Sequence, residues 1–286
     1  MNKSLIRRKI LSVQHRVNKR IYENRINLPF LSGDGFESIC DYSAYSPKKN
    51  FVNQKSISSA KSIFCTSHNL EALIQDFGNE INANTLVLGN SDRDFYEFDL
   101  ELPDSINKVF LQNSHISNNF FKTLPIGLEN LRLARNGIPA LFNSLNKKEI
   151  KKYEILVGPF SPSHAERKRL QEWRSINHKF LNYKEDYVSP KKLSYLSKEF
   201  LFIACPRGNG TDTHRFWETL YRGSIPVVTK SRWSDSIKEL GIPFVELSNW
   251  DFEELLQAVQ DQAYESIKPH EIEALWINNW KKVFIS

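Results

Sequence analysis

The chain has 286 residues, of which 40% are hydrophobic and 25% are charged, a composition typical of a globular protein. This is enough apolar material for one large core or two modest ones. No apolar run approaches the roughly 18 to 20 residues that span a bilayer, and the basic N-terminus is not followed by the apolar segment of a secretory signal.

The net charge of +6 is concentrated at the start of the chain. Residues 1–25 hold eight Lys or Arg and one Glu, so the rest of the chain carries about −1. A near-neutral body without a basic and aromatic stripe argues against a nucleic-acid partner. The widely spaced Cys40, Cys65 and Cys205 form no CxxC pair, which predicts buried free thiols in a reducing compartment and no structural zinc site.

The first predicted element is a basic amphipathic helix, because apolar residues recur at spacings of three and four: Ile6, Ile10, Val13, Val17 and Ile21. Two interpretations stay open. The apolar face packs on the domain, or residues 1–22 lie on an anionic membrane surface. The next segment, residues 22–60, is polar, contains Gly33, Gly35 and Pro47, and is predicted to be loop-rich.

Predicted strands and helices then alternate along the chain. Short apolar runs predict strands within 62–67, 84–89, 107–113, 155–160, 199–206, 224–228 and 243–247. Periodic segments predict helices at 70–77, 164–176, 189–198, 214–222, 235–241, 250–262 and 271–280. Such alternation indicates parallel sheets with crossover helices. With the lysine-rich segment 146–152 as a linker, we expect two α/β halves, residues 1–150 and 151–286.

Three polar loops follow predicted strands: GNSDRD (89–94), GPFSPSHAER (158–167) and CPRGNGTDTHR (205–215). In open parallel sheets, ligands bind beyond the carboxyl ends of the strands, so these loops are where the chemistry is expected. The last loop feeds a helix, whose N-terminus favours anions such as phosphate. The absence of GxGxxG and GxxxxGK[ST] disfavours a nicotinamide site or a P-loop.

Within this third loop, we expect Gly208 and Gly210 to supply positive φ and close backbone approach, and Asp212 or Thr213 to cap the helix. The alternative to a ligand-binding role is structural: the two glycines only form a turn, and the aspartate only caps the helix. On the helix, Glu218 with Arg222 could form only a surface ion pair of the i,i+4 type.

The string CPRGNGTDTHRFWETLYRGSIPVV (205–228) resembles the donor-binding region of exostosin-like glycosyltransferases and their bacterial relatives. The shared features are the Pro-x-Gly-x-Gly loop, Asp-Thr-His-Arg, Trp-Glu and the Gly-x-Ile-Pro-Val-Val ending. GPFSPSHAERKRL and KTLPIGLEN are weaker echoes. The resemblance spans roughly residues 85–250 and is strong only over 205–228.

This resemblance implies a GT-B fold, in which two Rossmann-like domains face a cleft and the last helix packs back on the first domain. The second domain would bind a nucleotide-sugar, with Glu218 holding the ribose and Arg167 and Arg215 facing the diphosphate. It implies no metal and no cofactor beyond the nucleotide-sugar as co-substrate. The donor-binding residues it implies are Ser161, His164, Arg167, Arg207, Gly208, Asn209, Gly210, Asp212, Thr213, His214, Arg215 and Glu218.

The resemblance also implies an inverting sugar transfer, which needs one base for the acceptor hydroxyl on the side of the first domain. Asp92 is the first candidate, with Asp94, His115 and Glu129 as rivals. The expected partners are a nucleotide-sugar donor and a glycan or glycolipid acceptor of a surface polysaccharide such as lipopolysaccharide or capsule. A cytoplasmic location is expected, with peripheral attachment to the inner face of the membrane left open.

Two alternatives remain. The Asp92-Arg93-Asp94 spacing is that of the D-x-D motif with which GT-A transferases hold a divalent cation such as Mg²⁺ or Mn²⁺. The chain could also be a non-catalytic protein that binds sugar nucleotides.

Overall fold

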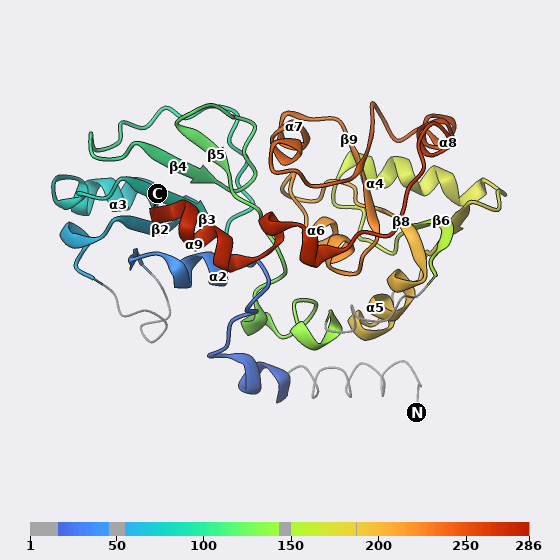
Figure 1. Cartoon of the computed structure of the whole chain (residues 1–286), viewed down its shortest axis with the longest axis horizontal. Coiled ribbons are helices and arrows are strands. Elements are labelled where there is room, and N and C mark those ends of the chain that lie inside the picture. The colour runs from blue at the N-terminus through green and yellow to red at the C-terminus, as the bar shows by residue number, and fades with distance from the viewer. Residues whose placement is uncertain (1–16, 46–54, 143–149, 187, 286) are drawn as a thin grey trace.

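The protein has an α/β fold built on two five-stranded parallel sheets that lie side by side along the long axis of the molecule (Figure 1). This computed structural model describes residues 17–45, 55–142, 150–186 and 188–285. Every pair of neighbouring strands is parallel, as the alternation of strands and helices predicts. The predicted fold class is therefore confirmed at the level of two parallel α/β layers.

The first sheet has its strands in sequence order. They are β1 (Tyr42–Ser43), β2 (Ser62–Thr66), β3 (Thr85–Gly89), β4 (Lys108–Leu111) and β5 (Phe121–Thr123). Alternate side chains enter two different cores. Phe64, Val87 and Phe110 belong to one cluster, whereas Ile63 and Leu86 belong to another on the opposite face. Burial on both faces explains why these strands read as continuous apolar runs.

The second sheet has the order β10-β9-β8-β6-β7. Its strands are β6 (Lys152–Val157), β7 (Leu181–Tyr183), β8 (Phe200–Ala204), β9 (Ile225–Thr229) and β10 (Val245–Leu247). After β7 the chain returns to the other side of β6, so the direction of winding reverses between β6 and β8. Loops at such a topological switch point diverge and leave a crevice for a ligand.

The helices of the first half and its return segment are α2 (Gly33–Ile39), α3 (Leu70–Phe77) and α9 (Ile277–Ile285). Those of the second half are α4 (Ala165–Leu170), α5 (Pro190–Lys198), α6 (His214–Tyr221), α7 (Arg232–Glu239) and α8 (Phe252–Gln260). Short 3₁₀ turns extend several of these elements, including residues 171–175 after α4 and 273–275 before α9.

Helix α2 corrects the prediction that residues 22–60 are loop-rich, which the glycines suggested. Its N-cap Ser32 accepts a hydrogen bond from the Gly35 amide at 3.0 Å. A Cβ on Gly33 would lie 1.8 Å from Oδ1 of Asn90, so this glycine serves a close contact with the loop after β3. These glycines therefore belong to a tightly packed helix. The prediction of a loop was wrong because glycine is also common in turns.

One apolar cluster extends through both halves. Helix α9 returns to the first sheet (Figure 1), where Trp280 meets Phe36 of α2 with ring centroids 5.4 Å apart and Phe284 meets Phe110 of β4 at 4.9 Å. The hydroxyl of Tyr221, on α6, accepts from the Leu31 amide at 2.9 Å and donates to the Leu275 carbonyl at 2.6 Å. The two sheets therefore share a buried core.

The three cysteines are buried and free, as their spacing predicts. Burial raises the pKa of Cys65 and of Cys205 to about 12, so neither thiol is a ready nucleophile. Of the basic N-terminal helix, residues 17–22 are helical with Val17 and Ile21 exposed, and residues 1–16 lie outside the described part, as do residues 146–149 of the expected linker. Among the described residues, no helix has the length and apolar character to cross a membrane.

Candidate functional site

A pocket of about 400 Å³ opens at the switch point of the second sheet, and we call it the switch-point pocket. Ten of the twelve predicted donor-binding residues line it together with Asp92, and His164 and Arg207 are the two that do not. The remaining lining residues, which sequence reasoning missed, are Ile126, Asn136, Phe160, Ser163, Leu193 and Pro206. Several of them lie inside quoted loops, but Asn136 and Leu193 come from segments without any motif.

The pocket lies where loops from the two sheets meet. The loop after β8 contacts the loop after β3 through Asn209, whose Nδ2 donates to Asp92 at 3.3 Å. It contacts the loop after β4 through the Asp212 amide, which donates to Oδ1 of Asn113 at 2.9 Å. The carboxyl ends of strands in both sheets therefore supply one polar site, as the position of the polar loops predicts.

The two glycines of the loop after β8 act by size. Neither Gly208 nor Gly210 is among the residues with positive φ, which corrects the expectation of a left-handed turn. A Cβ on Gly208 would lie 2.7 Å from Nη2 of Arg167, and one on Gly210 would lie 2.7 Å from the side-chain amide of Asn113. Glycine at these positions therefore leaves room for a guanidinium and an amide to approach the backbone, and a larger residue would displace them.

Two arginines stand at the pocket without an acidic partner. The guanidinium groups of Arg167 and Arg215 both lie beside the ring of Phe160, at 5.8 and 5.9 Å from its centroid. They donate to neutral oxygens only: Nη1 of Arg167 to Oγ of Ser163 at 3.1 Å, and Nη2 of Arg215 to the Pro159 carbonyl at 2.9 Å. In the described part of the chain, neither forms a salt bridge with a carboxylate.

The environment of Arg167 is unfavourable for its charge. Burial lowers its pKa, and the positive charge of Arg215 lowers it further, while Glu166 acts in the opposite direction. Its Nε is buried and has no hydrogen-bond partner. Two adjacent cations that are partly desolvated and lack a counterion are costly in a folded protein, unless an anion binds beside them.

Helix α6 begins at the same pocket and leaves its N-terminus open. Thr213 is the N-cap residue, but its side chain makes no capping hydrogen bond, and the Asp212 carboxylate is directed to the core instead. The expected cap is therefore absent. The Phe216 amide donates to the Thr213 carbonyl at 3.0 Å, and the amides of His214 and Arg215 remain for a ligand at the positive end of the helix dipole. His214 donates from Nδ1 to the Gly127 carbonyl at 2.8 Å, which leaves Nε2 as the acceptor nitrogen.

Glu218 lies one turn further along α6. It lines the pocket, although only 6% of its surface is exposed. Its Oε2 accepts from Nη1 of Arg222 at 3.3 Å, and Arg222 in turn lies over the ring of Phe142, 4.6 Å from the centroid. The interpretation of this pair as a surface ion pair is wrong, because both side chains are buried. The pairing with Arg222 fixes one oxygen of the Glu218 carboxyl group at the pocket wall, and the other oxygen is left for a ligand.

Asp212 links the pocket to the core of the first half. Its carboxylate accepts from the Ile126 amide at 2.8 Å and from Nε1 of Trp217 at 2.7 Å, and the residue is 3% exposed. Burial raises the pKa of Asp212 to about 7, although these N–H donors work in the opposite direction.

We therefore expect the Asp212 contribution to the unfolding free energy to fall as the pH rises from about 4 to about 7, because only the unfolded chain loses this proton in that range. The slope is at most about 1.4 kcal/mol per pH unit. Urea unfolding of the wild type and of Asp212→Asn at several pH values measures it. The difference between the two free energies should shrink as the pH rises, and parallel curves would contradict the assignment.

The four candidate bases have different surroundings. Asp92 is exposed and lines the pocket, with Asn209 as its hydrogen-bond donor. Asp94 forms a salt bridge with Arg207, accepts from Oγ1 of Thr211 at 2.8 Å and lies 3.3 Å from Nε2 of His115. Burial works to raise the pKa of Asp94, but these hydrogen bonds and the charge of Arg207 outweigh it, so the pKa is lowered. Asp94 and His115 therefore join the two halves.

The remaining predicted residues lie near the pocket but have other contacts. Oε2 of Glu129 accepts from the Asn136 amide at 2.9 Å, outside the pocket lining. His164 is the N-cap of α4, where its Nδ1 accepts from the Glu166 amide at 3.3 Å. Arg207 turns away from the pocket, and its Nη1 donates to the hydroxyl of Tyr96 at 3.1 Å.

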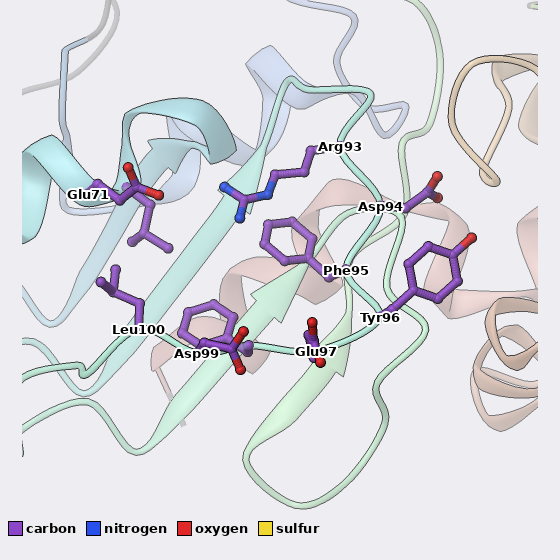
Figure 2. Close-up of a pocket in the computed structure, with 10 residues that line it drawn as sticks. Glu71, Arg93, Asp94, Phe95, Tyr96, Glu97, Asp99 and Leu100 are labelled. Carbon is purple, nitrogen blue, oxygen red and sulfur yellow. The ribbon is translucent and has the colours of Figure 1, made fainter.

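A separate pocket of about 450 Å³ lies between α3 and residues 93–100 (Figure 2). Arg93 and Phe95 lie together there, with the guanidinium 5.1 Å from the ring centroid. Figure 2 shows Asp94 and Tyr96 projecting to the opposite side of the strand-like segment, where both meet Arg207. Side chains alternate in direction along residues 93–96, so Asp94 and Tyr96 take part in the contact between the two halves of the chain.

The described residues contain no group of three or more His, Cys, Asp or Glu side chains with the arrangement of a metal site. The chain matches no model of a known protein family and no curated protein. The resemblance of residues 205–228 to exostosin-like glycosyltransferases therefore stays a prediction from the sequence.

Proposed function

We propose that the protein is a glycosyltransferase of the GT-B type, which moves a sugar from a nucleotide-sugar donor to a hydroxyl of a glycan or glycolipid acceptor. The observation that carries this proposal is the pair Arg167 and Arg215, two partly desolvated cations without a carboxylate partner in the described part of the chain. They flank the open N-terminus of α6 at the switch point of a doubly wound sheet. That combination fits a diphosphate.

A diphosphate suits this position better than a single carboxylate does. Arg167 and Arg215 share the ring of Phe160, so an anion between them contacts two guanidinium groups and receives amide hydrogen bonds from the first turn of α6. A ligand with two adjacent phosphates satisfies both arginines at once. The same cations then stabilise the diphosphate as negative charge develops on it during departure from the sugar.

The buried wall of the pocket fits the nucleoside. Glu218 lines the pocket and is paired with Arg222, and ribose hydroxyls are donors that match its carboxyl oxygens. His214 lies one turn before Glu218 on α6 and lines the same pocket, with its Nδ1 held by the Gly127 carbonyl at 2.8 Å. A neutral sugar without phosphates would leave Arg167 and Arg215 without a partner.

In the proposed reaction, Asp92 accepts the proton of an acceptor hydroxyl as its oxygen attacks the anomeric carbon of the donor. The new C–O bond forms while the bond to the diphosphate oxygen breaks, and the electron pair leaves with the diphosphate. Attack from the face opposite the leaving group inverts the anomeric centre. Asp92 belongs to the first half and lines the same pocket as the two arginines, which suits a base that acts on a donor bound there.

The metal-dependent alternative assigns Asp92 and Asp94 to one divalent cation. In the structure their carboxylates have different partners, because Asp94 is bound to Arg207 and Thr211, whereas Asp92 contacts Asn209. A cation would have to displace an arginine from Asp94. A metal-independent reaction is therefore the better fit to these contacts.

Calorimetry with UDP-, GDP- and CMP-sugars, followed by a donor hydrolysis assay with and without EDTA, tests the proposal. A UDP- or GDP-sugar should bind with roughly micromolar to submillimolar affinity and its slow hydrolysis should persist in EDTA, whereas a CMP-sugar, which has one phosphate, should bind more weakly. Absence of binding by all three classes at millimolar ligand would refute the proposal. Binding without hydrolysis or transfer would support the non-catalytic alternative, and loss of activity in EDTA would support the metal-dependent one.

A further inference from the structure

The loop after β8 is a thin wall between two pockets. Its residues Gly208, Asn209 and Gly210 line the switch-point pocket, whereas Arg207 and Thr211 line a second pocket of about 390 Å³ on the other side. We call this the cationic pocket. It is closed by the loop between β9 and α7 and by Tyr96 and His115 from the first half. Both pockets therefore open where the two halves of the chain meet.

The cationic pocket has two free positive charges. Lys230 follows β9 and Arg232 begins α7, and in the described part of the chain neither side chain forms a salt bridge or a hydrogen bond. Arg207 adds a second guanidinium, which forms a salt bridge with Asp94 and whose Nε is buried without a hydrogen-bond partner. Glu166 is the one carboxylate in the lining, and its Oε2 is occupied by the Arg207 amide at 3.1 Å and Nε1 of Trp250 at 2.8 Å. The excess positive charge favours an anion.

The opposite wall is aromatic. The rings of Tyr96 and His115 are stacked with centroids 4.1 Å apart and an angle of 10° between their planes. The hydroxyl of Tyr96 is fixed by Nη1 of Arg207 at 3.1 Å, and Nε2 of His115 lies 2.9 Å from Oγ1 of Thr211. Fixed rings beside hydroxyl groups are a common surface for the apolar face and the hydroxyls of a sugar ring.

We propose that the cationic pocket binds a negatively charged sugar unit of the acceptor, either a sugar acid or a sugar phosphate, through Lys230 and Arg232 with Tyr96 as the platform. This rests on the proposed glycosyltransferase function. The donor diphosphate already has Arg167 and Arg215 on the other side of the loop, so a second cationic pocket across this wall suits the other substrate. An acceptor with an anionic unit beside its reacting sugar would bridge the two pockets.

The test uses NMR titration of the full chain with three probes of one ring geometry: D-glucose, D-glucuronate and D-glucose 6-phosphate. We expect one or both anionic probes to bind at least tenfold more tightly than glucose, and this preference to weaken with salt. Preference for glucuronate identifies a sugar acid, and preference for the phosphate identifies a phosphorylated unit. Equal affinity for all three probes would overturn the proposal.

Variants locate the binding. The pair Lys230→Ala and Arg232→Ala, and the charge reversal of both to Glu, should remove the preference for anionic probes while UDP affinity stays within about twofold. Both side chains are exposed, so the fold should tolerate these changes. The matched control is Lys281→Ala with Lys282→Ala on α9, which are equally exposed and should leave the preference intact. Retention of the preference in the charge-reversed variant would overturn the assignment.

The two proposals can fail separately. If UDP competes with the anionic probe and the double variant of Arg167 and Arg215 abolishes probe binding, the probe occupies the switch-point pocket and the cationic pocket is not a site. If no nucleotide binds but the anionic probe still depends on Lys230 and Arg232, the anion site stands and the donor proposal falls.

Discussion

Replacing Arg167 and Arg215 together by alanine is expected to weaken nucleoside diphosphate binding by at least 100-fold. Each guanidinium would form a charge-assisted hydrogen bond with a phosphate oxygen, and such bonds contribute roughly 1.5 to 3 kcal/mol each. Isothermal titration with the best-binding nucleotide measures the loss. The effect should exceed that of any single variant because the two cations bind the same ligand.

Two controls separate binding from folding in this experiment. The matched lysine variants keep both charges but lose the planar donors, so they should recover part of the affinity. Thermal unfolding should show no loss of stability in the double alanine variant, because removal of two adjacent cations relieves their repulsion. Unchanged nucleotide affinity in a folded double variant would refute the diphosphate site and with it the proposed donor pocket.

The change Asp92→Asn is expected to lower the rate of sugar transfer by 100-fold to 10,000-fold, the usual range for loss of a general base. The substitution is isosteric, and the asparagine Oδ1 can still accept from Nδ2 of Asn209. Donor affinity should therefore stay within about twofold of the wild type. Transfer kinetics with saturating donor and acceptor, combined with calorimetry, separate the chemical step from binding.

Asp94→Asn is the comparison for Asp92→Asn, because the two aspartates lie two positions apart with different contacts. Loss of the Asp94 charge breaks the salt bridge with Arg207 and should lower stability, with activity falling only as far as the halves shift. If Asp94→Asn abolishes transfer in a stable protein while Asp92→Asn remains fully active, the base belongs to the Asp94 and His115 group.

Much of the fold could be predicted because its central strands are continuous apolar runs and its helices have a clear apolar periodicity. The predicted strands at 84–89 and 199–206 contain β3 and β8, and the one at 224–228 covers β9 except for its last residue. All three strands are buried on both faces. Strands β1, β5 and β7 escape the sequence prediction, because each has only two or three residues at a sheet edge and no buried apolar run. Strands are recognised in a sequence by runs of buried apolar residues, and strands at a sheet edge contain few buried residues.

The part of the candidate pocket that one loop and one helix form could be predicted from the sequence. Residues 205–218 were singled out because glycines, cations and a carboxylate follow a buried strand, and these determine one wall of the pocket. The contacts that these residues make differ from those expected from their neighbours in the sequence. Asp212 was expected as a cap but accepts from Ile126, a residue 86 positions away. Only tertiary contacts decide such roles, so a local reading finds the residues and misassigns their partners.

The arrangement of α9 also affects how the chain acquires its structure. Phe284 and Trp280 complete the apolar cover over α2 and β4, yet they are synthesised after the entire second half. The first half therefore leaves the ribosome with an open apolar face, which is covered only after the whole second half has been synthesised. Chaperones that shield exposed apolar surface have a defined target during that interval.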